Sequence, residues 1–165
     1  MTGSKILILA TGGTIDKIYF DALSEYQVGS TQIARLLEVG RVAAPFEIVE
    51  LMRKDSLELT DADRAEIAAA VEQADVDRII VTHGTDTMTA TADALADVAG
   101  KTIVLVGALA PARFAESDAP FNLGMAFAAA QVAPPGVYIT MNGSVFRAGE
   151  VEKDRARGLF VPTAR

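Results

Sequence analysis

The chain has 165 residues, of which 50% are apolar, and its formal net charge is −7 at pH 7. This length predicts one domain, residues 1–165, and the apolar content excludes an intrinsically disordered chain. The chain has no cysteine, which excludes disulfides, iron–sulfur clusters and thiol catalysis, and its single histidine, His83, excludes a multi-histidine metal site. If the chain is an enzyme, its nucleophile is therefore an oxygen or a lysine nitrogen.

Short apolar runs alternate with helical patterns along the chain. Strands are predicted, in chain order, at Ile6–Leu9, Phe46–Met52, Arg78–Thr82, Thr102–Gly107 and Gly136–Met141, with a shorter one near Val145. Helices are predicted from Ser30 or Thr31 to Glu38, from Asp61 to about Ala74, at Thr85–Val98 and at Pro120–Val132. This alternation is typical of an α/β fold, in which helices cover both faces of a mostly parallel, flavodoxin-like sheet in three αβα layers.

Two helical segments carry further signals. Thr60-Asp61-Ala62-Asp63 has the pattern of a capping box, which would start the helix at Asp61. The segment Pro120–Val132 is apolar nearly all round and is predicted to be buried in the core or in an interface. Because so much uncharged surface is hard to cover in one small domain, we expect a homo-oligomer, a dimer or a tetramer.

The charge and the apolar stretches also bear on partners and location. A negative net charge disfavours nucleic acid, because neutralising phosphates requires clustered lysine and arginine. The first apolar stretch, Ile6 to Ala10, is shorter than the roughly seven residues that a secretory signal needs. The longest uncharged stretch, Ala119 to Phe146, is interrupted by Pro134, Pro135 and Gly136, so it is not a membrane span. We therefore expect a cytoplasmic protein that binds neither nucleic acid nor membrane.

Ligands of open α/β sheets bind outside the carboxyl ends of the strands, so the residues after each strand are the candidate site. These residues are Ala10-Thr11-Gly12-Gly13-Thr14-Ile15-Asp16, Thr82-His83-Gly84-Thr85-Asp86-Thr87, Gly107-Ala108 and Met141-Asn142-Gly143. Glycine beside threonine allows close backbone approach and leaves N–H groups free to face a developing oxyanion. A plain strand-to-loop turn is an equally good interpretation of Gly12-Gly13 alone. No phosphate-loop pattern is present.

The activation of a hydroxyl nucleophile has two possible routes in this sequence. A Ser-His-Asp arrangement would need His83 as its base, but a lone histidine is more often structural. The other route uses a lysine or a tyrosine. A neutral lysine base requires burial to lower its pKa, whereas a neighbouring carboxylate raises that pKa, so the sequence leaves both routes open.

Two of these strand-end segments, Thr11-Gly12-Gly13-Thr14-Ile15 and Thr82-His83-Gly84-Thr85-Asp86-Thr87, resemble the signature motifs of bacterial-type L-asparaginases. Further similar segments are Tyr26-Gln27-Val28-Gly29, Asp55-Ser56-Leu57-Glu58-Leu59-Thr60, Val106-Gly107-Ala108, Pro120-Phe121-Asn122, and Met141-Asn142 followed by Lys153. The resemblance covers essentially the whole chain but only the amino-terminal half of the usual family member. It therefore implies a short-chain branch with the fold of the family's amino-terminal domain and no second domain.

The resemblance implies amide hydrolysis through a covalent acyl-enzyme. Thr14 would attack the side-chain amide carbon of the substrate and release ammonia. Tyr26 would assist proton transfer at Thr14 from a lid, and the segment from Ile18 to Ser30 suits a lid because it has few helix or strand signals. Lys153 would accept a proton from Thr85. As plain alternatives, Lys153 is a solvated charge and Tyr26 an exposed loop aromatic.

Substrate binding is implied for a second group of residues, namely Asp86 for the ammonium, Ser56 for the carboxylate, the backbone N–H of Thr85 for the oxyanion, and Gly13 and Ala108 as further contacts. As plain alternatives, Thr85 and Asp86 form a helix N-terminus and Ser56 a turn. The chain departs from the family at Leu57, where a polar residue usually helps to hold the substrate. The acidic contact from the family's second domain is also expected to be missing or replaced. No role is assigned to Asp16 or Lys17.

The first hypothesis is an L-asparaginase that forms L-aspartate and ammonia through a threonine acyl-enzyme without a metal or an organic cofactor. A variant of this hypothesis is an amidase for glutamine or another small amide. The alternative from another class is a non-catalytic subunit of the same fold, which binds an amino acid or a partner chain. Ammonia release from asparagine distinguishes these hypotheses.

Overall fold

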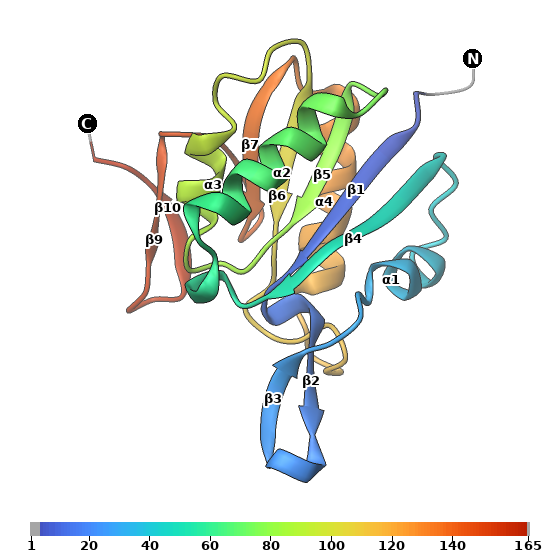
Figure 1. The fold of residues 1–165 in the computed structure, drawn as a ribbon, viewed down its shortest axis with the longest axis vertical. Coiled ribbons are helices and arrows are strands. Elements are labelled where there is room, and N and C mark those ends of the chain that lie inside the picture. The colour runs from blue at the N-terminus through green and yellow to red at the C-terminus, as the bar shows by residue number, and fades with distance from the viewer. Residues whose placement is uncertain (1–3, 165) are drawn as a thin grey trace.

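The computed structural model describes residues 4–164, so residues 1–3 and 165 of the expected domain 1–165 lie outside the described residues. Its centre is a six-stranded sheet with the strand order β4-β1-β5-β6-β7-β8 (Figure 1). The strands are β1 (Ile6–Gly12), β4 (Phe46–Lys54), β5 (Arg78–Thr82), β6 (Thr102–Val106), β7 (Gly136–Met141) and β8 (Ser144–Arg147). Neighbouring strands are parallel except for the β7–β8 pair. The expected α/β class with a mostly parallel sheet is therefore confirmed.

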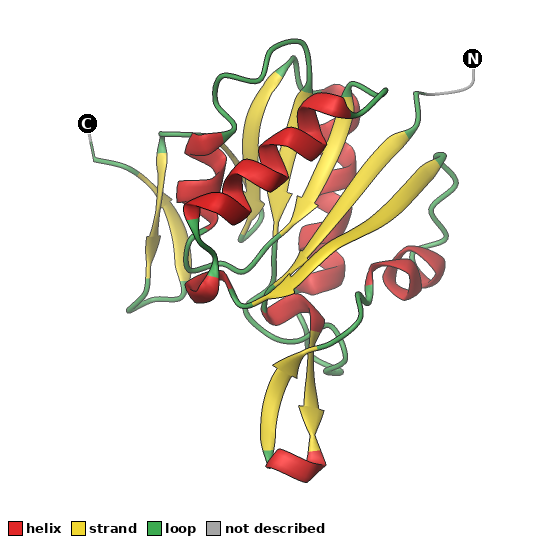
Figure 2. Ribbon diagram, in the orientation of Figure 1, coloured by secondary structure: helices red, strands yellow, loops and turns green. Residues whose placement is uncertain are grey.

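Helices cover both faces of this sheet (Figure 2). They are α1 (Ile33–Val39), α2 (Asp61–Gln73), α3 (Met88–Ala94) and α4 (Ala119–Val132). One hydrophobic core lies between the sheet and helices α1 and α4, and a second lies between the sheet and helices α2 and α3. The predicted Asp61 helix is confirmed together with its capping box, in which the Thr60 hydroxyl accepts from Asp63 N–H.

The central strands contribute side chains to both cores because successive side chains alternate between the two faces of the sheet. In β5, for example, Ile80 packs on the α4 side while Ile79 and Val81 pack on the α2 side. This alternation within continuous apolar runs explains why the strand predictions from sequence were close to the observed bounds. The rigid sheet holds its carboxyl edge, where the glycine- and threonine-rich segments begin, in one place.

Two β-hairpins lie outside the central sheet. The first consists of β2 (Lys17–Phe20) and β3 (Glu25–Val28), and the second of β9 (Val151–Asp154) and β10 (Leu159–Pro162). Figure 1 shows the β2–β3 hairpin projecting from the body of the molecule, whereas the β9–β10 hairpin lies beside α3. The segment from Ile18 to Ser30, which has few helix or strand signals in the sequence, therefore forms most of a β-hairpin. Its residues are half-buried or exposed and carry no core-facing apolar pattern, so sequence periodicity did not reveal the strands.

Two helix bounds also differ from expectation. Helix α3 begins at Met88 rather than at Thr85, because the preceding residues are held by contacts outside the helix, among them the Thr87 hydroxyl, which donates to the Ser56 carbonyl at 2.7 Å. Helix α1 is not capped by the side chain of Ser30, but the hydroxyl of Thr31, the other expected cap, accepts from Ile33 N–H at 3.3 Å. The carboxylate of Asp16, sixteen residues before Gln32, adds a second acceptor, for Gln32 N–H at 2.8 Å. A distant residue therefore adds to the local signal at α1 and replaces it at α3.

Two further findings concern membrane-spanning helices and metal sites. Within residues 4–164, no helix is long and apolar enough to cross a membrane. In the same range, no group of three or more His, Asp or Glu side chains gathers closely enough to hold a metal ion.

Candidate active site

The two glycine- and threonine-rich segments meet backbone to backbone at the carboxyl edge of the sheet. Gly13 has φ +85°, and a Cβ atom added there would lie 2.4 Å from the Cα of Gly84. A Cβ on Gly84 would in turn lie 2.6 Å from the side chain of Ser56. Only glycine permits these approaches, because any side chain would overlap the neighbouring backbone. The close contact places Thr14 and Thr85, each the next residue after its glycine, on two adjoining loops.

Lys153 reaches this edge from β9. Its ammonium group lies 2.8 Å from the Thr85 hydroxyl and 2.8 Å from the carboxylate of Asp86. The lysine side chain is largely buried, as is the Thr85 hydroxyl that it contacts. The sequence-predicted residues Thr85, Asp86 and Lys153 are therefore brought together, although Lys153 lies more than sixty residues from the other two. Its plain interpretation as a solvated charge does not fit this geometry.

The β9–β10 hairpin that carries Lys153 is anchored at several points. Val151 and Phe160 are buried in the core on the α2 side. The side-chain oxygen of Asn142, which follows β7, accepts from Phe160 N–H at 2.8 Å. These contacts fix the strand and therefore the position from which the Lys153 side chain reaches Thr85.

Asp86 faces a second cation that sequence reasoning did not identify. The guanidinium of Arg155 lies 3.7 Å from the Asp86 carboxylate and 3.5 Å from the Asp86 backbone carbonyl. Arg155 lies in the turn that directly follows β9, so the strand alternation of side chains could not have revealed its contact with Asp86 from the sequence. Asp86 is thus flanked by two positive charges in a half-buried position.

Ser56 presents a buried hydroxyl beside the crossing of the two loops. The residue is 1% exposed, and within the described residues its Oγ has no hydrogen-bond partner. A buried hydroxyl without a partner is costly, so its position beside Gly84 marks a place where a ligand oxygen can bind. The adjacent Leu57, in contrast, is exposed to solvent, consistent with the missing polar contact expected there.

Asp55, next to Ser56, is charged at neutral pH. Partial burial acts to raise its pKa, but the ammonium of Lys17 at 2.7 Å and the N–H of Leu57 hold the pKa of this carboxyl below its usual value. Lys153 adds a further favourable charge. Lys17 therefore ties the base of the β2–β3 hairpin to the segment that carries Ser56.

Tyr26 is not brought to Thr14. It lies on β3 of the projecting hairpin, is 50% exposed, and its ring contacts the rings of Tyr19 and Phe114 edge-on at 5.4 and 5.9 Å. No hydrogen bond between the Tyr26 and Thr14 hydroxyls is present in residues 4–164. A pocket of about 430 Å³ opens beside Tyr26, lined by Lys17, Glu25, Tyr26, Gln27, Val28, Arg53, Asp55 and Glu58.

The loop after β6 places Ala108 beside the same edge in a fixed conformation. Ala108 is buried, and the next two N–H groups, of Leu109 and Ala110, donate to the carboxylate of Asp118 at 2.9–3.0 Å. Asn122 in α4 donates to the Gly107 carbonyl at 3.0 Å. The start of α4 therefore holds the backbone around Ala108.

His83 is structural in this arrangement. It is fully buried, and its two ring nitrogens lie 2.6 Å from the Gly84 carbonyl and 2.7 Å from the Thr91 hydroxyl. Burial lowers the pKa of His83 to about 4. With both nitrogens occupied inside the protein, the imidazole cannot serve as the base of a Ser-His-Asp arrangement.

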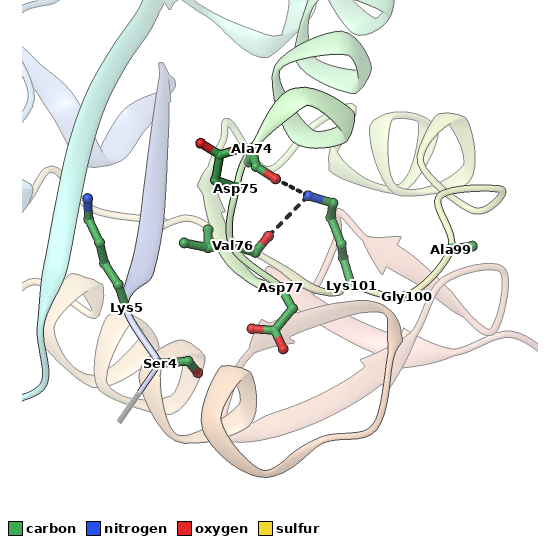
Figure 3. A pocket seen from close by; sticks show the side chains of 9 residues that line it. All are labelled: Ser4, Lys5, Ala74, Asp75, Val76, Asp77, Ala99, Gly100 and Lys101. Carbon is green, nitrogen blue, oxygen red and sulfur yellow. Dashed lines mark hydrogen bonds between the residues drawn. The ribbon is translucent and has the colours of Figure 1, made fainter. Parts of the chain in front are cut away.

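A larger pocket, of about 650 Å³, lies elsewhere in the molecule (Figure 3). It is lined by Ser4, Lys5, Ala74, Asp75, Val76, Asp77, Ala99, Gly100 and Lys101. Figure 3 shows Lys101 turned toward the carbonyls of Ala74 and Val76, to which its ammonium donates. Lys101 thereby satisfies backbone carbonyls just after the end of α2, so the fold itself explains its position. This pocket borders the amino ends of the strands, away from the glycine- and threonine-rich segments.

The fold and this edge define an α/β domain whose polar site lies where its parallel strands end. A family model described as asparaginase, N-terminal, matches residues 5–160. The chain therefore belongs to the asparaginase family, as the resemblance of its motifs predicted.

Individual relatives agree with this assignment. The chain is 31% identical to an L-asparaginase of Thermococcus kodakarensis over 161 residues, which cover 94% of this chain and 49% of that protein. It is 32% identical to a glutaminase-asparaginase of Acinetobacter glutaminasificans, covering 91% of this chain and 50% of the relative. The structure of L-asparaginase I from Vibrio cholerae superposes with a TM-score of 0.84 at 28% identity, covering 97% and 51% of the two chains. The chain thus spans about half the length of the curated relatives that it matches.

Proposed function

We propose that the protein hydrolyses the side-chain amide of L-asparagine to L-aspartate and ammonia through a threonine acyl-enzyme. The observation that carries this proposal is the contact of Lys153 with both Thr85 and Asp86 at 2.8 Å, beside the loop that bears Thr14. A hydroxyl nucleophile needs an adjacent group that exchanges its proton, and this cluster supplies one without histidine.

In the first half of the reaction, the Thr14 hydroxyl oxygen bonds to the amide carbon of the substrate. The carbonyl oxygen takes up the negative charge, which the N–H groups of the glycine- and threonine-rich loops stabilise. The proton that leaves the Thr14 hydroxyl passes to the amide nitrogen, the carbon–nitrogen bond breaks, and ammonia leaves. Tyr26 assists the proton transfer at Thr14 after the β2–β3 hairpin moves toward the site.

In the second half, a water molecule attacks the Thr14 ester and gives its proton to the Thr85 hydroxyl oxygen, while the Thr85 proton passes to Lys153 in its neutral amine form. The oxygen–carbon bond of the ester breaks, Thr14 regains its hydroxyl proton, and aspartate is released. Lys153 exchanges this proton from a position between the Thr85 hydroxyl and the Asp86 carboxylate. Because general acid–base groups contribute typically 10²–10⁴-fold to a rate, the cluster should be indispensable for turnover.

The substrate is oriented by its two charged groups. The unpartnered Ser56 hydroxyl donates a hydrogen bond to the substrate carboxylate, and Asp86 pairs with the substrate ammonium. Gly13 and Ala108 border the amide. As a variant of this proposal, the same contacts hold glutamine, whose side chain is one carbon longer, or another small amide. One relative of this chain is named glutaminase-asparaginase.

We also propose that the protein is a homo-oligomer. The uncharged stretch Ala119–Phe146 leaves several apolar side chains exposed, with Phe121 at 63%, Val132 at 83% and Val145 at 50%. Light scattering at micromolar concentration should give a dimer or tetramer mass, and a monomer mass would contradict this part of the proposal. A cytoplasmic location stays a prediction.

The test of the function is ammonia release from asparagine and glutamine, measured side by side on the purified protein with and without a chelator. We expect ammonia from asparagine at a rate that the chelator does not change. Calorimetric binding of asparagine without ammonia release would instead support the non-catalytic, amino-acid-binding alternative.

A further inference from the structure

Asp16 is a buried carboxylate to which neither the fold core nor the proposed chemistry assigns a task. It ends the short turn Thr14–Asp16 and directly precedes β2, the first strand of the projecting hairpin. The residue is 1% exposed, although the hairpin that follows it is largely exposed. A buried carboxylate requires hydrogen-bond partners, so its partners show what it holds.

The partners of Asp16 all lie just beyond the other end of the same hairpin. Its carboxylate accepts from Gln32 N–H at 2.8 Å and from the Thr31 hydroxyl at 3.3 Å. Its backbone carbonyl accepts from Gly29 N–H at 2.9 Å. We call these three hydrogen bonds the Asp16 clamp. The clamp joins the residue before the hairpin to the residues after it, and so closes the hairpin at its base.

The same residue is fixed to the turn that carries Thr14. Asp16 N–H donates to the Gly13 carbonyl at 3.1 Å, and the Ile15 carbonyl accepts from Ala112 N–H at 3.0 Å. The base of the hairpin and the backbone turn that carries Thr14 are therefore parts of one hydrogen-bonded unit. The hydrogen bonds of Asp16 to the residues after β3 therefore set the direction in which the hairpin projects from this unit.

A small tilt of the hairpin at the clamp becomes a larger displacement of the Tyr26 ring. Tyr26 lies in the third residue pair from the clamp, since Lys17 pairs with Val28, Ile18 with Gln27 and Tyr19 with Tyr26. At about 3.3 Å per residue, Tyr26 stands about 10 Å from the clamp. A tilt of about 10° at the clamp then moves the Tyr26 ring by about 2 Å, enough to lose a hydrogen bond.

We propose that Asp16 is the positioning residue of the β2–β3 hairpin, which sets where Tyr26 stands relative to Thr14. This inference rests on the proposed function for its catalytic consequence, but the clamp itself is a property of the hairpin. It also explains why Asp16, with its short side chain and its buried position, follows Thr14 so closely in the sequence.

The clamp has a predicted pH dependence. Burial raises the pKa of Asp16 to about 6, against the opposing effect of its hydrogen bonds from Gln32 and Thr31. The charged groups that face it come from β4, where Glu50 raises this pKa and Arg53 lowers it. Glu50 itself accepts from Thr31 N–H at 2.8 Å. Below about pH 6 the clamp loses its negative charge, and hydrogen bonds to an uncharged acceptor are weaker.

The test compares four variants with the wild type by asparagine turnover. Asp16→Ala removes the acceptor, Asp16→Asn keeps the Oδ1 acceptor without the charge, and Thr31→Val weakens the clamp from its other side. Asp21→Asn is the matched control, because it removes an exposed carboxylate at the tip of the same hairpin. We expect kcat at pH 8 to fall more than about tenfold in Asp16→Ala and about threefold in Asp16→Asn and Thr31→Val, with KM nearly unchanged in all.

A second readout follows the hairpin without turnover. The chain has three tyrosines and no tryptophan. Tyr19 and Tyr26 lie on the hairpin, and Tyr138 is buried in the core. Acrylamide quenching of tyrosine fluorescence therefore reports on the hairpin, and it should increase in Asp16→Ala but not in Asp21→Asn. The kcat of Asp16→Asn should also no longer decline as the pH falls through 6.

Wild-type kcat and wild-type quenching in Asp16→Ala would overturn the inference. So would an equal loss of kcat in the Asp21→Asn control, or an undiminished decline of kcat through pH 6 in Asp16→Asn. If Asp16→Ala does not fold, Asp16→Asn and Thr31→Val decide by the same criteria. If the wild type releases no ammonia from any amide, the proposed function fails, and quenching alone then decides on the clamp.

Discussion

The two hairpins of the molecule carry their proposed catalytic side chains in opposite ways. The β9–β10 hairpin buries Val151 and Phe160 in the core and delivers Lys153 at 2.8 Å from its partners. The β2–β3 hairpin projects from the body, and its Tyr26 is half exposed and makes no hydrogen bond with Thr14 in the described residues. A fixed hairpin suits a group that must hold its partners throughout the reaction, whereas a movable one suits a group that must admit substrate first.

The largest expected effect is on the fixed hairpin. Lys153→Met removes the ammonium but keeps a long apolar side chain, and we expect kcat for ammonia release to fall by about 10²–10⁴-fold. The control is Arg157→Met on the same hairpin, whose guanidinium pairs with Asp154 at 2.6 Å rather than with the site. Equal activity in the two variants would show that the cluster around Thr85 is not catalytic.

The next prediction concerns how the two hairpins contribute to stability. Phe160→Ala leaves a cavity in the core on the α2 side, and we expect the free energy of unfolding to fall by about 3–5 kcal/mol. Phe20→Ala on the exposed hairpin should change it by less than about 0.5 kcal/mol. Urea unfolding followed by circular dichroism measures both, and similar values would erase the contrast between the hairpins.

The buried carboxylate at the base of the projecting hairpin leads to a prediction about pH and stability. Because burial raises the pKa of Asp16 from 3.8 to about 6, the ionised form costs the folded state about 3 kcal/mol above pH 6, and this cost disappears as the pH falls toward 4. Asp16→Asn should therefore be more stable than the wild type at pH 7–8, by up to about 3 kcal/mol. A stability difference that is the same at pH 4 and pH 8 would contradict the raised pKa.

The smallest expected effect is at Tyr26 on the same hairpin. Tyr26→Phe keeps the ring contacts with Tyr19 and Phe114 and removes only the hydroxyl. We expect kcat to fall about tenfold, the lower end of a general acid–base contribution, with an unchanged free energy of unfolding. Tyr19→Phe changes the cross-strand neighbour of Tyr26 and should keep wild-type kcat. If kcat fell equally in Tyr19→Phe and Tyr26→Phe, the Tyr26 hydroxyl would have no specific role in catalysis.

The contrast between the hairpins also separates what the sequence could reveal from what it could not. The central strands were predictable because continuous apolar runs such as Ile79–Val81 must be buried on both faces. The segments around Thr14 and Thr85 were predictable because they follow such strands. The β2–β3 hairpin was not predictable, since its strands contribute little to the core and so lack its periodicity.

The site residues divide in the same way. Lys153 was identified through its resemblance to a family motif, and from residue pattern alone it is one charge among several in Glu150–Arg157. Its contact with Thr85 depends on a chain reversal that local signals do not encode. Asp16 and Arg155 were missed because each acts on residues distant in sequence, Asp16 on Thr31 and Gln32, and Arg155 on Asp86. Long-range contacts of this kind become visible only in the folded chain.

The central claim is that Thr14 forms the covalent intermediate, and rapid-quench mass spectrometry with asparagine tests it most directly. In Lys153→Met, where attack of water on the ester should be slowed, we expect an aspartyl ester on the peptide that contains Thr14. Thr14→Ala should show neither the ester nor ammonia release. An ester on another residue, or wild-type ammonia release by Thr14→Ala, would contradict the account.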